Sequence, residues 1–140
     1  MTSEIRNAID DFLLLVWSPA DTPRDVGQLI QSLDRLAYLA HGIEYEFDGV
    51  DYPPPPGPRY AQTFSQAETW LKKLLQGTEE DRYAAAVDDL AGIIDDLEEI
   101  GWRFRDTSEA DALREFELGF QTHWGHHLRS LQHILHDWYW

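Results

Sequence analysis

The chain contains no cysteine, and this absence excludes disulfides, thiolate metal sites and a cysteine nucleophile. Long hydrophobic runs are also missing. The longest, Phe12 to Trp17, spans six residues, far fewer than the roughly 20 that a helix needs to cross a bilayer. The first residues lack the layout of a secretory signal peptide. We therefore expect a soluble protein of the cytoplasm.

Basic residues are scarce as well. Eleven Lys and Arg stand against 26 Asp and Glu, which gives a formal net charge of −15. A field of that sign repels phosphate backbones and anionic lipid, so we expect neither a nucleic-acid nor a membrane partner, whereas a basic protein fits. Hydrophobic residues make up 43% of the 140 residues, which suffices for one core. Residues 1–140 are therefore predicted to form one folded domain rather than a disordered acidic tail.

Apolar residues recur at the three- and four-residue spacing of an amphipathic helix over five segments. The segments cover residues 5–17, 22–42, 60–77, 78–104 and 108–138. Three of them open with a capping box, in which a Ser or Thr and an acid three residues later bond each other's backbone; the pairs are Thr22 with Asp25, Thr78 with Asp81, and Ser108 with Asp111. The sequence predicts an all-α fold, an antiparallel helical bundle of about five helices.

Residues 43–59 interrupt this pattern between the second and third segments. Ile43, Tyr45 and Phe47 alternate with acids before Asp48-Gly49, a dipeptide that suits a hairpin turn. A small hairpin is therefore one alternative, although two short arms without a sheet are marginal. Residues 53–58 contain five prolines and one glycine and are typical of a stiff polyproline connector. We expect a proline-rich loop within one domain.

Histidines gather near the C-terminus, where five of the six lie between residues 123 and 136. His123 and His127 are four residues apart, the spacing at which one helix face offers two ligands to a metal ion. With His41 as the third ligand, the layout resembles DinB-type metal-binding bundles, which implies a zinc- or nickel-class divalent ion on these three residues. The alternative is that the imidazoles pack at a helix interface and hydrogen-bond across it. The chain has no His-Glu-x-x-His or Glu-x-x-His motif, so the common zinc-protease and di-iron sites are not expected.

The stretch from Asp88 to Glu99 holds six carboxylates and no basic residue. On a helical wheel most of them lie away from the apolar seam, which is typical of a solvated helix face. The functional alternative is a negative docking ridge for a basic partner, with Asp88, Asp95 and Glu99 as contact residues. Paired general-acid carboxylates are not expected, because the pattern places nothing apolar around them to raise a pKa.

Four glycines lie inside predicted helices: Gly92, Gly101, Gly119 and Gly125. Each costs about 1 kcal/mol against alanine in a helix interior. Close approach of a neighbouring helix or an aromatic ring would explain them, and the pair Trp124-Gly125 suggests an indole lying against a facing backbone.

The C-terminal motif Phe-x-x-His-Trp-Gly-x-His occupies Phe120, His123, Trp124, Gly125 and His127. It resembles a bacterial family of unknown function, which is also similar around Asp88-Asp89-Leu90-Ala91. The resemblance implies a helical bacterial domain and supplies no activity. Our leading hypothesis is a small acidic non-enzymatic interaction or accessory protein. The alternative is a metal-binding helical bundle, including a metal-dependent enzyme of DinB-like layout.

Overall fold

The computed structural model describes residues 2–20, 22–55 and 60–140. Over these residues the fold contains six helices and no strand. The helices are α1 (Thr2–Trp17), α2 (Pro23–Leu39), α3 (Tyr60–Lys72), α4 (Glu80–Asp106), α5 (Glu109–Thr122) and α6 (Trp124–Tyr139). The all-α prediction is confirmed. The predicted count of about five is one too low, because the segment 108–138 forms two helices that meet at His123. In the described part of the chain, no helix has the length and apolar character needed to cross a membrane.

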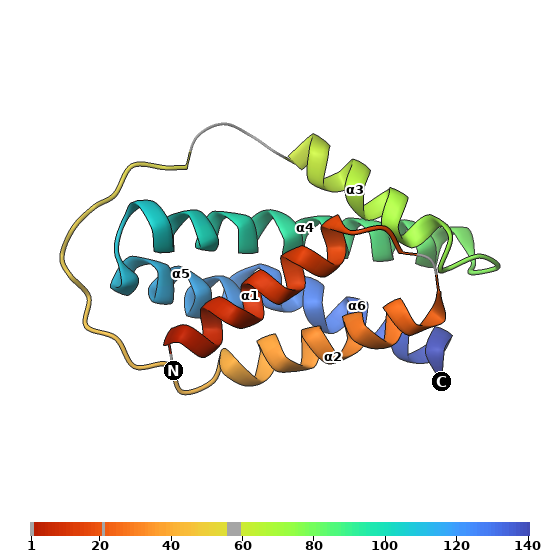
Figure 1. Cartoon of the computed structure of the whole chain (residues 1–140), viewed down its shortest axis with the longest axis horizontal. Helices are drawn as coiled ribbons and strands as arrows, with labels where there is room; N and C mark the ends of the chain where they lie inside the picture. The colour runs from red at the N-terminus through yellow and green to blue at the C-terminus, as the bar shows by residue number, and fades with distance from the viewer. Residues whose placement is uncertain (1, 21, 56–59) are drawn as a thin grey trace.

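The longest helix, α4, lies in the middle of the molecule and contacts α1, α3, α5 and α6. The chain reverses after α4, so α5 and then α6 run back along it (Figure 1). Contacts at both ends fix this direction: Arg103 pairs with Asp111 at the start of α5, and Arg82 pairs with Asp137 near the end of α6. α2 packs between α1 and α6. The central position of α4 means that most of its sides face other helices.

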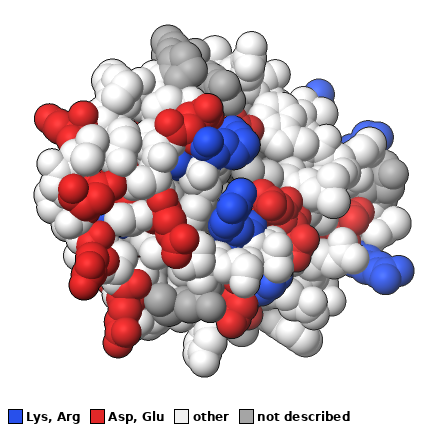
Figure 2. Space-filling view, turned by 60° about the vertical axis from the view of Figure 1, so that its left-hand side comes forward, with Lys and Arg blue, Asp and Glu red and all other residues white. Residues whose placement is uncertain are grey.

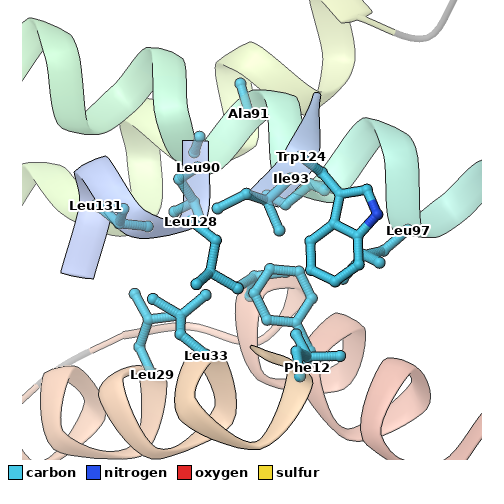
Figure 3. Close-up of a cluster of buried hydrophobic side chains, with 14 of the residues drawn as sticks. Phe12, Leu29, Leu33, Leu90, Ala91, Ile93, Leu97, Trp124, Leu128 and Leu131 are labelled. Carbon is cyan, nitrogen blue, oxygen red and sulfur yellow. The ribbon is translucent and has the colours of Figure 1, made fainter. Parts of the chain in front are cut away.

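The apolar stripes of four helices meet in one core. Figure 3 shows side chains from α1, α2, α4 and α6 pointing toward one another. Burying a side chain of this kind stabilises a fold by about 1.5–3 kcal/mol. The residues labelled there are all buried: Phe12, Leu29, Leu33, Leu90, Ala91, Ile93, Leu97, Trp124, Leu128 and Leu131. Most of these residues belong to the predicted apolar stripes, whereas Ala91, Ile93 and Leu128 are buried although they lie outside them.

Two of the three predicted capping boxes mark real helix starts. The Asp111 backbone N–H donates to Ser108 Oγ over 3.1 Å at the start of α5, and the Thr22 backbone N–H donates to Asp25 Oδ2 over 3.0 Å before α2. The prediction for Thr78 is wrong, because α4 has Glu79 as its N-cap and no side-chain cap bond. The connection from α3 turns at Gly77, where φ is +84°. The N-cap therefore falls at Glu79, one residue after the predicted Thr78.

The loop between α2 and α3 contains no strand over residues 43–55, so the hairpin alternative is wrong for that range. Asp48 accepts hydrogen bonds from the Val50 backbone N–H, the Tyr52 hydroxyl and the Ser108 hydroxyl. The bond from Ser108 is the largest cause that lowers the pKa of Asp48. These bonds fold the loop on itself and attach it to the start of α5, around one end of the molecule (Figure 1). The polyproline connector stays a prediction, since Pro56 and Pro58 lie outside the described residues.

Candidate functional site

The corner between α5 and α6 positions the histidines. His123 is its single non-helical residue, with φ −143° and ψ −83°. The indole of Trp124 is buried and lies so close to Gly119 that an added Cβ there would come within 2.8 Å of the indole Cδ1. At Gly125 an added Cβ would overlap the carbonyl oxygen of Phe120. The two glycines thus permit the close approach that the sequence predicts, and the corner depends on it.

Each of the two histidines bonds an aspartate of α4. His123 Nδ1 lies 2.5 Å from Asp96 Oδ2, and His127 Nδ1 lies 2.9 Å from Asp89 Oδ1. A carboxylate only accepts, so the ring N–H donates in both pairs. The imidazoles themselves are 5.0 Å apart in an edge-to-face arrangement. The structure therefore combines two predicted ligands, His123 and His127, with two carboxylates that sequence reasoning assigned to solvent.

Gly92 allows His127 to lie directly on the backbone of α4. A Cβ at Gly92 would come 2.8 Å from His127 Cδ2 and 3.0 Å from its Nε2, distances that a real side chain does not adopt. The ring is three-quarters buried, with 24% of its side chain exposed. The prediction that a ring or helix approaches Gly92 closely is confirmed, and the ring is an imidazole.

The acidic side of α4 is less exposed than the sequence suggests. Asp88 is exposed, but Asp95, Asp96 and Glu99 are half-buried and Asp89 is buried. The prediction of a solvated face is wrong for Asp89, because α6 packs against that side of α4. Burial also raises the pKa of Asp96, while the hydrogen bond with His123 acts in the opposite direction. Surroundings that raise a carboxyl pKa are therefore present, contrary to expectation.

A cavity of about 190 Å³ opens beside His123, between α4 and the corner. Its walls carry three carboxylates, from Asp96, Glu99 and Glu115, together with His123 and the buried Trp124. Arg103 lies next to this cavity and bonds Glu99 over 3.3 Å and Asp111 over 2.9 Å. Sequence reasoning missed Glu115 altogether. No sequence signal places it here, since only the chain reversal after α4 brings it opposite Glu99.

His41, the third predicted metal ligand, lies just after α2. Its ring packs edge-to-face on Phe120, with the ring centroids 5.8 Å apart. The structure therefore brings His123 and His127 together and places His41 against an aromatic ring of α5. The three-histidine metal site stays a prediction.

The two segments on which the family resemblance rests contact each other, since Asp89 of the first bonds His127 of the second. Comparison of the chain with protein-family models, with curated proteins and with solved structures gives no match. The resemblance stays a prediction.

Proposed function

We propose that the protein is a small acidic interaction protein, an antiparallel helical bundle that binds a basic protein partner in the cytoplasm without catalysing a reaction. The observation that carries this proposal is the cavity between α4 and the α5–α6 corner, with Asp96, Glu99 and Glu115 in its walls. In this proposal the cavity receives one Lys or Arg side chain of the partner.

The charge around the cavity supports a cationic occupant. The negative charges of Asp95 and Glu99 both act to raise the pKa of Asp96, whereas Arg103 offsets part of the negative charge by bonding Glu99 and Asp111. A cleft in which one sign of charge prevails focuses the potential and raises the local concentration of the opposite charge. Because burial penalises the charged form of Asp96, an incoming cation would stabilise that form. Binding of a cation would therefore stabilise the charged carboxylate, in addition to the attraction that brings the cation to the cavity.

The wider surface carries the same sign. Figure 2 turns the left-hand side of Figure 1 forward and shows Asp and Glu densest on the left of that face, with Lys and Arg in its middle and along its right-hand edge. Asp88 and Asp95, which the sequence singles out with Glu99, extend the negative charge along α4. Ligand cavities for drug-sized molecules measure about 300–1,000 Å³. A cavity of about 190 Å³ instead suits the end of one side chain.

The test is a nitrogen-15 NMR titration with a short arginine-rich peptide and with the same peptide carrying citrulline in place of arginine. We expect the arginine peptide alone to shift the backbone amides of Thr122, His123 and Trp124. Its affinity should fall with added salt, since screening shortens from about 10 Å at 0.1 M to about 3 Å at 1 M. Glu115→Gln should weaken binding, whereas Glu80→Gln, at the exposed start of α4, is the matched control. Binding that ignores both salt and Glu115→Gln would contradict the proposal.

A further inference from the structure

We infer that Asp88 and Asp89 of α4 and His127 of α6 form a binding site for one divalent transition-metal ion. Each residue offers one ligand atom, and these atoms all lie within 4.8 Å of one another. An ion bound at about 2.0–2.2 Å from oxygen and nitrogen ligands holds them closer together than that. The site would therefore contract when it binds an ion, with the exposed Asp88 at its edge. Neither Asp88 nor Asp89 lies in the walls of the cavity beside His123.

A buried oxygen without a partner points to a missing ligand. Asp89 has 7% of its surface exposed. Its Oδ1 bonds His127, whereas its Oδ2 is buried without a hydrogen-bond partner. Leaving a buried acceptor unsatisfied costs about 1–3 kcal/mol, and more for a charged group. A cation bound at this carboxylate would remove that cost, which a simple His–Asp packing pair leaves in place.

The surroundings hold two of the three ligands in place. Gly92 lets the His127 ring lie on the α4 backbone, which limits how the ring can turn. The Nδ1–H of this ring bonds Asp89 in the chain without an ion, and that proton would leave when an ion binds between the two residues. The Tyr60 hydroxyl donates to Asp88 Oδ1 over 2.8 Å and so orients the exposed carboxylate. Partners of this kind, outside the ligands themselves, set the ligand orientation in known metal sites.

The donor set selects the class of ion. Two carboxylates and one imidazole suit zinc or a similar transition metal, whereas calcium and magnesium favour oxygen ligands throughout. Three protein ligands with one exposed member leave a coordination position open to solvent. We therefore expect zinc to bind once per chain and calcium and magnesium not to compete.

The test is a titration of the full chain with Zn²⁺ against a chromophoric chelator. We expect one zinc per chain, with affinity falling at acid pH because imidazole must lose its proton to bind. Asp88→Asn, Asp89→Asn and His127→Gln should each reduce affinity strongly. Tyr60→Phe, which removes only the orienting hydroxyl, should reduce it about 10- to 100-fold. His133→Gln is the matched control because it lies on α6 with an exposed side chain.

Asp89→Asn carries a risk of misfolding, so circular dichroism accompanies each variant and the exposed Asp88→Asn keeps the test decisive. The variants His41→Gln and His123→Gln distinguish the two ligand sets. They should retain stoichiometric zinc if the site is Asp88, Asp89 and His127. Loss of zinc in both would establish the three-histidine set and overturn this inference. Failure of the unmodified chain to bind zinc in the micromolar range, or unchanged binding by folded Asp88→Asn, would also overturn it.

Discussion

Replacing Gly92 by alanine tests the packing that the whole candidate site depends on. The new Cβ would come 2.8 Å from His127 Cδ2 and 3.0 Å from Nε2, so the ring has to leave the α4 backbone. Because the same ring donates to the buried Asp89, its displacement breaks that hydrogen bond. We therefore expect Gly92→Ala to destabilise the protein, although alanine is the better helix former.

The magnitude follows from two opposing effects. Alanine gains about 1 kcal/mol over glycine in a helix interior, and losing a hydrogen bond to a charged group costs about 1.5–3 kcal/mol. The difference is a net loss of about 0.5–2 kcal/mol. For a chain of 140 residues, an unfolding entropy of roughly 2.1 cal/mol/K per residue converts this loss into a Tm lowered by about 2–7 °C.

Gly101→Ala is the matched control in the same helix. Gly101 is also buried in α4, but the nearest atom to its added Cβ is the flexible end of Arg105 at 3.4 Å. Thermal and urea unfolding should show this variant stabilised by about 1 kcal/mol. In a His127→Ala background Gly92→Ala should become stabilising too, because the ring is gone. Equal stabilities of the two glycine variants in the natural background would refute the packing argument.

Two further predictions concern charges along α4. Arg103→Met should cost about 3 kcal/mol in urea unfolding, because it leaves Asp111, 5% exposed, without its cation. The exposed Arg105→Met should stay within about 0.5 kcal/mol. For Asp96, burial raises the pKa above 3.8, so the folded state holds this proton to higher pH than the unfolded state. The stability of the natural chain relative to Asp96→Asn should therefore fall as pH rises from 3.8 through the raised pKa. A difference that grows with pH would mean that the charged pair with His123 dominates.

The helices were predictable because their apolar stripes repeat at helical spacing, and most of the core residues labelled in Figure 3 belong to those stripes. The break at His123 was not predictable from spacing. One non-helical residue leaves the apolar stripe nearly continuous from α5 to α6. Phe116 before this residue is buried, and so are Trp124 and Leu128 after it. The available signal was Gly119 and Gly125, whose close contacts with Trp124 and Phe120 make the corner possible.

Only half of the candidate site was predictable from the sequence. His123 and His127 stand out by their spacing, but their partners Asp89 and Asp96 belong to an acidic stretch that looks solvated on a helical wheel. A wheel treats a helix as having one inner side, whereas α4 contacts four other helices. Which acids are buried therefore depends on tertiary packing. The seven-residue interval between Asp89 and Asp96 matches two helical turns, which places both on one side of α4. Only the positions of the facing histidines identify these two aspartates as part of the site.

The buried pair of Asp89 and His127 also determines how α6 is aligned along α4. An interface made only of Leu, Ile and Ala side chains would lose little contact if α6 slid by one turn, about 5.4 Å. The same slide would carry His127 away from Asp89 and leave a buried carboxylate with no partner, at a cost of several kcal/mol. It would also move the ring away from Gly92, where α4 has room for it. This buried contact thus favours one register among several that the hydrophobic surface would accept, as do the pairs of Arg82 with Asp137 and of His123 with Asp96.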